Sequence, residues 1–106
     1  MVSSVKYFPN KLTMTWIRSS YKEGTLTPAE LADEIVQRAE KYRDYNIWIV
    51  APDLKRMMGY IEKLPKDMES LPLWGIPFAV KDNIDVAGSP TTAACPDYAY
   101  DPKEDA

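Results

Sequence analysis

The first half of the chain repeats apolar residues at helical spacing. Met14, Ile17 and Tyr21 fall on one face, which predicts a short helix. The tetrad Thr27-Pro28-Ala29-Glu30 then supplies the cap, first-turn proline and glutamate of a capping box. Behind it an apolar stripe with charged residues on the other faces predicts an amphipathic helix to about residue 43. The stripe consists of Leu31, Ala32, Ile35, Val36, Ala39 and Tyr42.

Two short apolar runs interrupt this helical pattern. Residues 46–50, Asn-Ile-Trp-Ile-Val, are rich in β-branched and aromatic side chains and predict a short buried strand. A further amphipathic helix follows from Pro52, and Pro65 ends it. Residues 76–80 predict a second buried strand, in which Pro77 favours either the first paired position or an edge.

These elements predict an α/β fold class, with N-terminal helices and two short strands of a larger mixed sheet. Two isolated short strands do not form a stable sheet, so we expect the sheet to be incomplete in this chain. Asp101-Pro102-Lys103-Glu104 repeats the helix-start pattern of residues 27–30 just before Ala106. We therefore expect the chain to be cut from a longer protein, the alternative being that the repeat arose by chance.

Length and charge exclude several classes of partner. The 106 residues fit one domain. A net charge of -3 and a pI near 4.9 give no electrostatic reason to bind nucleic acid or an anionic membrane. No apolar run has the length of a signal peptide or a membrane span, so we expect a cytoplasmic protein.

The residue types present also limit the chemistry. The chain has no histidine and one cysteine, which excludes a Ser-His-Asp triad, a Cys-His pair and a cysteine zinc site. We expect no metal and no cofactor, and we expect Cys95 to be a small, part-buried loop residue. Ser89, Thr91 and Thr92 lie in a Gly/Pro-rich loop, where hydroxyls more often shape the backbone than hold substrate.

A lysine ends the second apolar run. Burial disfavours the charged ammonium, which is how a lysine becomes a base, and Lys81 directly follows four apolar residues and Pro77. Asp82 and Asp85 would instead favour the charged form. The pattern alone favours a surface lysine that reaches water beside Asp82, because ion-paired surface lysines are commoner than catalytic ones.

A longer match changes this interpretation. Residues 75–88 read Gly-Ile-Pro-Phe-Ala-Val-Lys-Asp-Asn-Ile-Asp-Val-Ala-Gly, and Thr91-Thr92-Ala93 follow after a short gap. This run resembles the lysine motif of the amidase signature family. Residues 94–100, the Leu26-Thr27-Pro28 helix start and residues 46–49 resemble the allophanate hydrolase members of that family, whereas many other members have a Gly-Ser type sequence near Ala94 and Cys95.

The resemblance implies an activity. It implies a Ser-cisSer-Lys triad that hydrolyses allophanate to ammonia and carbon dioxide, in which Lys81 is the catalytic base. The bridging serine and the nucleophilic serine lie in a Gly/Ser-rich segment further along the family's domain, and this sequence has no such segment. We therefore expect the 106-residue chain to be inactive alone.

The resemblance also implies a domain organisation. Residues 1–106 would be the N-terminal fragment of an amidase signature domain. Its helical part would cover about 14–45, and the start of the core sheet with the catalytic-lysine loop would cover 46–106. The expected partner of the full-length parent is a small amide, allophanate, and exposed sheet edges leave homo-oligomers or strand pairing open. The alternative is a stand-alone, non-catalytic binding module that pairs its strands with a partner chain.

Overall fold

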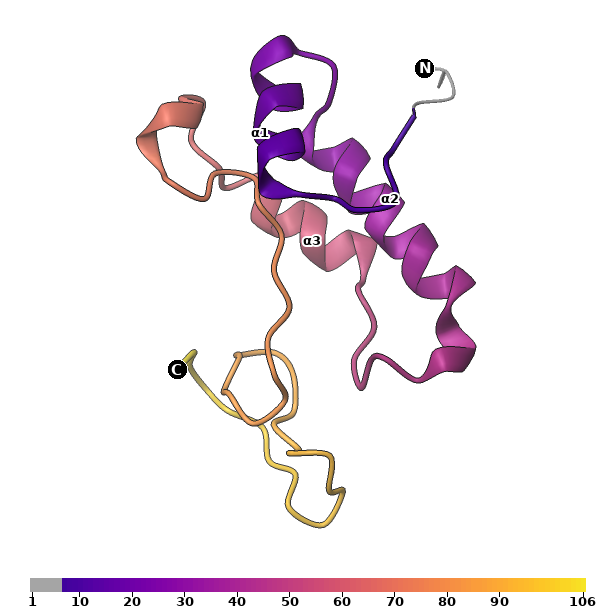
Figure 1. Cartoon of the computed structure of the whole chain (residues 1–106). Coiled ribbons are helices and arrows are strands. Elements are labelled where there is room, and N and C mark those ends of the chain that lie inside the picture. The colour runs from indigo at the N-terminus through magenta and orange to yellow at the C-terminus, as the bar shows by residue number, and fades with distance from the viewer. Residues whose placement is uncertain (1–6) are drawn as a thin grey trace.

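The regular elements of the protein are helices. A computed structural model describes residues 7–106. It contains α1 (Met14–Glu23), α2 (Pro28–Lys41) and α3 (Leu54–Ile61), with short 3-10 helices at Arg43–Tyr45 and Met68–Ser70. Figure 1 shows the three α-helices grouped together, while the chain after residue 80 forms a separate loop region away from α1. All three predicted helices are confirmed.

Each helix begins after a capping side chain, and the capping box predicted at residues 27–30 is confirmed. The Thr27 hydroxyl accepts a hydrogen bond from the Glu30 backbone N–H at 3.2 Å, and the Thr27 N–H donates to the Glu30 carboxylate at 2.9 Å. This capping box satisfies donors that the first turn of α2 leaves without helical partners. Thr13 caps α1 and Asp53 caps α3 in the same way through one side-chain oxygen each.

The core lies where α1, the following turn and the start of α2 meet. Ile17, Tyr21, Leu26 and Leu31 are buried together, and Leu31 is only 1% exposed. Burying one such side chain contributes about 1.5–3 kcal/mol. Partly buried residues from both ends of the helical part pack against this cluster: Phe8, Leu12, Trp16, Ile35, Met68, Trp74 and Ile76.

Tyr21 fixes the chain where it leaves this core. Its hydroxyl donates a 2.6 Å hydrogen bond to the Gly75 carbonyl oxygen, and its ring meets the Trp74 ring edge-on at 5.4 Å between centroids. Gly75 has a φ of 68°, and a Cβ there would lie 2.8 Å from the Tyr21 Cε2. Both the left-handed backbone and the close ring therefore require glycine.

The two predicted strands do not form, so the strand part of the α/β prediction is wrong for residues 7–106. Asn46 adopts a left-handed conformation (φ 55°) that ends the 3-10 helix, and residues 47–50 continue as irregular chain. Residues 76–80 are extended but unpaired, and Pro77 lacks an N–H to donate. Neither segment has a neighbouring strand, which a short strand needs in order to persist.

The apolar residues of these segments remain largely uncovered. Ile47 is 64% exposed and Phe78 is 83% exposed, and Trp48, in the strand predicted to be buried, is also exposed. The radius of gyration is 15.4 Å, whereas a compact chain of this length has about 13 Å. The accessible surface is 8221 Å², against about 6,000 Å² for a compact monomer of this mass.

Two further expectations can be compared with the structure. Residues 101–106 contain bends and no helix, so the helix start predicted from Asp101-Pro102-Lys103-Glu104 is not formed in this region. Within residues 7–106, the helices are too short or too polar to cross a bilayer.

Replacing Leu31 with alanine tests the position of the core. Leu31→Ala removes a buried side chain and should lower the free energy of unfolding by about 2–5 kcal/mol. Ile47→Ala removes a similar side chain from an exposed position and should change it by less than about 0.5 kcal/mol. Urea unfolding followed by circular dichroism measures both; equal losses would contradict this core.

Tyr21 should make the fold sensitive to alkali. Burial raises the pKa of Tyr21 from about 10 to about 12, because the charged phenolate is poorly solvated there. A raised folded-state pKa gives stability that is complete below about pH 10 and is lost as pH rises towards about 12. Unfolding measured across this range should show a loss on the order of 2 kcal/mol.

Phenylalanine variants provide the comparison. Tyr21→Phe should unfold more easily at neutral pH by about 1 kcal/mol, because the Gly75 carbonyl loses its donor. It should also lack the alkaline loss that Tyr21 causes. Tyr7→Phe alters an exposed tyrosine and should keep that loss. An unchanged alkaline profile in Tyr21→Phe would show that another group is responsible.

Candidate functional site

The candidate site is the loop of residues 81–106, called here the lysine loop. Its two arms are joined by an antiparallel bridge between Thr91 and Tyr100. The Thr91 N–H donates to the Tyr100 carbonyl at 2.8 Å, and the Tyr100 N–H donates back at 3.1 Å. Thr91 is only 1% exposed. The bridge therefore gives this irregular segment a defined shape.

Two aspartates next to the lysine hold this shape. The Asp85 carboxylate accepts hydrogen bonds from the Thr91 hydroxyl at 2.8 Å and from the Tyr100 hydroxyl. The Asp82 carboxylate accepts from the Thr92 hydroxyl, and its backbone carbonyl accepts from Ala93 at 3.0 Å. Both carboxylates thus order the loop, and neither forms an ion pair with Lys81 in the described part of the chain.

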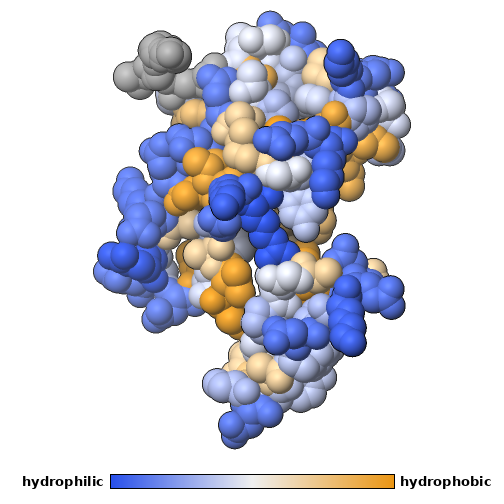
Figure 2. Space-filling model, turned by 180° about the vertical axis from the view of Figure 1, so that it is seen from behind, coloured by the Kyte–Doolittle hydropathy of each residue, from blue (hydrophilic) through white to orange (hydrophobic). Residues whose placement is uncertain are grey.

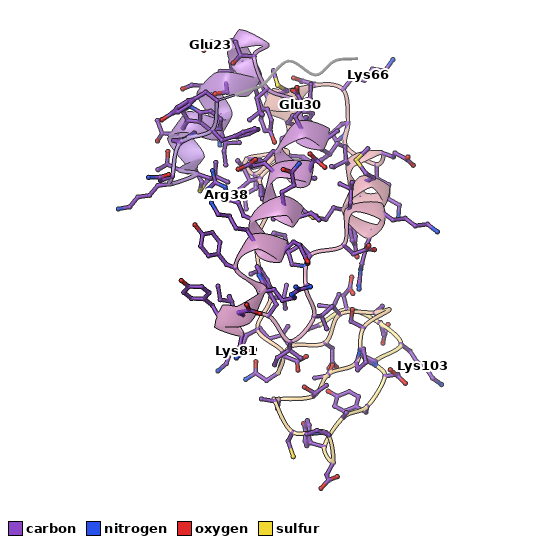
Figure 3. All side chains as sticks on the ribbon, turned by 90° about the vertical axis from the view of Figure 1, so that its right-hand side faces the viewer. Glu23, Glu30, Arg38, Lys66, Lys81 and Lys103 are labelled. Carbon is purple, nitrogen blue, oxygen red and sulfur yellow. The ribbon has the colours of Figure 1, made fainter. Side chains whose placement is uncertain are left out.

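Lys81 lies at the surface, as the sequence pattern alone favoured, and the buried strand expected just before it is not formed. Lys81 is exposed, and so are the three residues before it, Phe78, Ala79 and Val80. Figure 3 shows Lys81 at the edge of the molecule, separated from Lys103 by the width of the loop region. The end of the apolar run, residues 78–80, is exposed, so the dry surroundings that would make this amine a base are not formed here.

The loop hydroxyls bond within the protein. Thr91 and Thr92 donate to the aspartates, and the Ser89 hydroxyl accepts from the Arg56 guanidinium. These contacts support the loop-shaping interpretation of all three residues. Cys95 is exposed rather than part-buried, because it lies in the turn after Thr92, where Ala93 and Ala94 both have positive φ.

Arg56 is a contact residue of the lysine loop that the sequence pattern did not indicate. This residue lies in the first turn of α3, and its guanidinium donates to the Ala87 carbonyl at 2.9 Å as well as to Ser89. A cleft between α3 and the lysine loop is lined by Arg56, Tyr60, Lys63, Gly88 and their neighbours. The partners of Arg56 lie 31 and 33 residues further along, so no local pattern could have indicated them.

Figure 2 shows where apolar side chains reach the surface. Orange residues gather on the middle of this face, between the helical part above and the loop region below. The exposed large apolar residues of the two irregular segments are Ile47, Trp48, Ile49, Val50, Phe78 and Val80. Exposed apolar area of this kind is unusual for a free-standing monomer and typical of an interface.

The chemistry available in residues 7–106 is limited. Lys81 offers an amine, but no hydroxyl is hydrogen-bonded to it among the described residues, so no nucleophile is activated. No group of three or more carboxylate or thiol residues in this part of the chain is placed to hold a metal. The arrangement can present a proton acceptor on an ordered loop, and a nucleophile would have to come from elsewhere.

Comparison with known proteins relates this loop to a group of enzymes. The profile of the family described as Amidase matches residues 30–106. The chain is 48% identical to the urea amidolyase of Saccharomyces cerevisiae over 62 residues, which is 57% of this chain and 3% of that protein. It is 65% identical to the urea amidolyase of Lachancea kluyveri over 37 residues, 35% of this chain and 2% of that protein.

A bacterial relative is similar over a larger share of this chain. The mandelamide hydrolase of Pseudomonas putida is 33% identical over 89 residues, covering 81% of this chain and 18% of that protein. The chain therefore spans less than a fifth of each of these relatives.

The Asp85 network can be tested through Tyr100. The hydrogen bond to the Asp85 carboxylate raises the pKa of Tyr100, because it stabilises the protonated phenol and its charge opposes a phenolate. Asp85→Asn removes that charge and should lower the pKa of Tyr100 towards its ordinary value. Ultraviolet absorbance of tyrosinate, compared with Tyr100→Phe to isolate this residue, measures the change. A Tyr100 titration unaltered by Asp85→Asn would contradict the contact.

Proposed function

The chain belongs to the amidase signature family, and we propose that it is the N-terminal part of an allophanate hydrolase in which Lys81 is the catalytic base. The observation that carries this proposal is the run of residues 75–88, which resembles the family's lysine motif throughout its length. The similarity to two urea amidolyases supports the choice of allophanate, since the amidase part of such proteins is allophanate hydrolase.

The proposed chemistry gives Lys81 one role. As a neutral amine it accepts a proton through a bridging serine, and this makes the second serine nucleophilic. That serine attacks the amide carbonyl of allophanate, and hydrolysis yields ammonia and carbon dioxide. Both serines would be supplied by a Gly/Ser-rich segment outside these 106 residues, so the chain alone has no activity.

The geometry supports an incomplete site of this kind. The Tyr21 hydroxyl fixes Gly75, so the segment that leads to Lys81 starts from a defined point. From Phe78 to Lys81 the segment is exposed. Further strands packed against Phe78 and Val80 would cover this run and exclude water around the lysine, which would favour its neutral form.

A second function follows from the same exposed segments. A non-catalytic binding module could add residues 46–50 and 76–80 as strands to the sheet of a partner chain. The observation that favours it is the exposure of Ile47, Ile49 and Phe78 along unpaired backbone. Here the 106-residue chain would be a functional unit and would need no downstream serines.

Replacing Lys81 distinguishes the two functions. In the longest natural open reading frame that contains this chain, Lys81→Ala should lower the turnover of allophanate by about 100- to 10,000-fold. Lys103→Ala changes an exposed lysine in the same loop and should leave turnover unaltered. Ammonia release measures both, and the isolated 106 residues should release none.

Two results would count against the assignment. Near-normal turnover in Lys81→Ala would remove the lysine from the mechanism. A natural reading frame that stops after Ala106, together with a stable complex of this chain with a partner, would favour the binding module.

A further inference from the structure

We propose that Arg56 is a positioning residue for Lys81: it holds the lysine loop against α3 and thereby sets where the amine is presented. This inference rests on the proposed function, because it assigns Arg56 a part in the same reaction. Arg56 does not contact the reacting atoms in this proposal and acts through the loop alone.

The position of Arg56 is itself fixed. It lies in the first turn of α3, where its backbone N–H donates to the Asp53 carboxylate at 3.1 Å. That helix packs against α2, which carries the core residue Leu31. The backbone of Arg56 therefore has a defined position relative to the core, which a residue in an irregular loop would lack.

The guanidinium grips the loop at two points. Its Nη2 donates to the Ala87 carbonyl at 2.9 Å, and its Nη1 donates to the Ser89 hydroxyl. Gly88 lies between these acceptors with a φ of 90°, and a Cβ there would lie 3.6 Å from Nη2. The turn therefore brings both acceptors onto one side, where a planar group with several donors in a fixed fork can reach them together.

From Ser89 the contacts lead back to the lysine. Thr91 and Thr92 follow Ser89 closely and donate to Asp85 and Asp82, and Asp82 is bonded covalently to Lys81. The Lys81 carbonyl also accepts from the Ile84 N–H at 3.0 Å. A shift of residues 87–89 would thus displace the backbone of Lys81, because the threonine–aspartate hydrogen bonds and the covalent chain connect the two.

Arg56 is also the link between two parts of the molecule. Among the described residues, the hydrogen bonds from the Arg56 guanidinium to Ser89 and Ala87 are the side-chain hydrogen bonds that join residues 7–70 to the lysine loop. The covalent path between the two parts runs through residues 76–80, which are extended and unpaired. Without Arg56 the loop would be tethered mainly by this segment and would sample more orientations.

The test uses the natural open reading frame and the hydrolysis of allophanate. Arg56→Ala should lower kcat by roughly 10- to 100-fold, as expected when a reacting group is displaced, and should leave KM little changed. Added guanidinium should restore part of the lost kcat, because it can occupy the vacated site. Arg43→Ala removes an exposed arginine paired with Glu40 and should have no effect on kcat or on rescue.

A double-mutant cycle guards against a variant that is merely unstable. Ser89→Ala removes one acceptor of Arg56 from the loop side, and its effect on kcat should not add to that of Arg56→Ala. Additive effects, a lack of guanidinium rescue, or a normal kcat in Arg56→Ala would each overturn the inference. Failure of the proposed function gives a different result, because Lys81→Ala would then keep near-normal turnover. In that case the inference about Arg56 would be overturned together with the proposed function.

Discussion

The hydrogen bond between the Tyr21 hydroxyl and the Gly75 carbonyl determines how the rest of the chain is placed. It joins a helix of the core to the first residue of the lysine motif. The glycine is required by its backbone conformation and by the nearness of the ring, so the motif's first residue serves packing. The catalytic proposal for Lys81 therefore depends on a contact six residues before it.

The residues of the lysine motif have different roles in this structure. Its apolar residues 78–80 lie exposed, its aspartates order the loop, and its lysine remains unpaired in the described part of the chain. Aspartates beside a lysine are readily interpreted as its ion-pair partners. Here they accept hydrogen bonds from threonine hydroxyls, which leaves the amine free to interact with groups that this chain does not contain.

The sequence was informative where structure is set locally. The helix starts at Thr13, Thr27 and Asp53 depend on side chains within three residues. The helices could therefore be predicted, and for α2 the cap was predicted as well. Residues 46–50 have the composition of a strand, but a strand requires a partner that composition cannot supply. The prediction failed there for that reason. Division of the chain near residue 45 remains a prediction.

The candidate site was predictable only in part. Lys81 was identified from a long motif, and the pattern alone favoured its surface position. The exposure of the apolar residues before it was not foreseen, because burial depends on neighbours distant in sequence or outside this chain. The contact of Arg56 with Ala87 and Ser89 joins residues more than 30 positions apart and leaves no periodic signal. Long-range polar contacts of this kind become visible only when the chain is folded.

Residues 46–51, Asn-Ile-Trp-Ile-Val-Ala, have a consequence for solubility. They are apolar apart from one amide, carry no charge and contain no proline, which is the composition of segments that stack into cross-β aggregates. In this structure they are unpaired and exposed. Charged residues and a proline flank them, with Arg43 and Asp44 before and Pro52 and Asp53 after, as gatekeepers commonly do. The segment that suits the interior of a sheet is thus also the one that makes this chain prone to aggregate while uncovered.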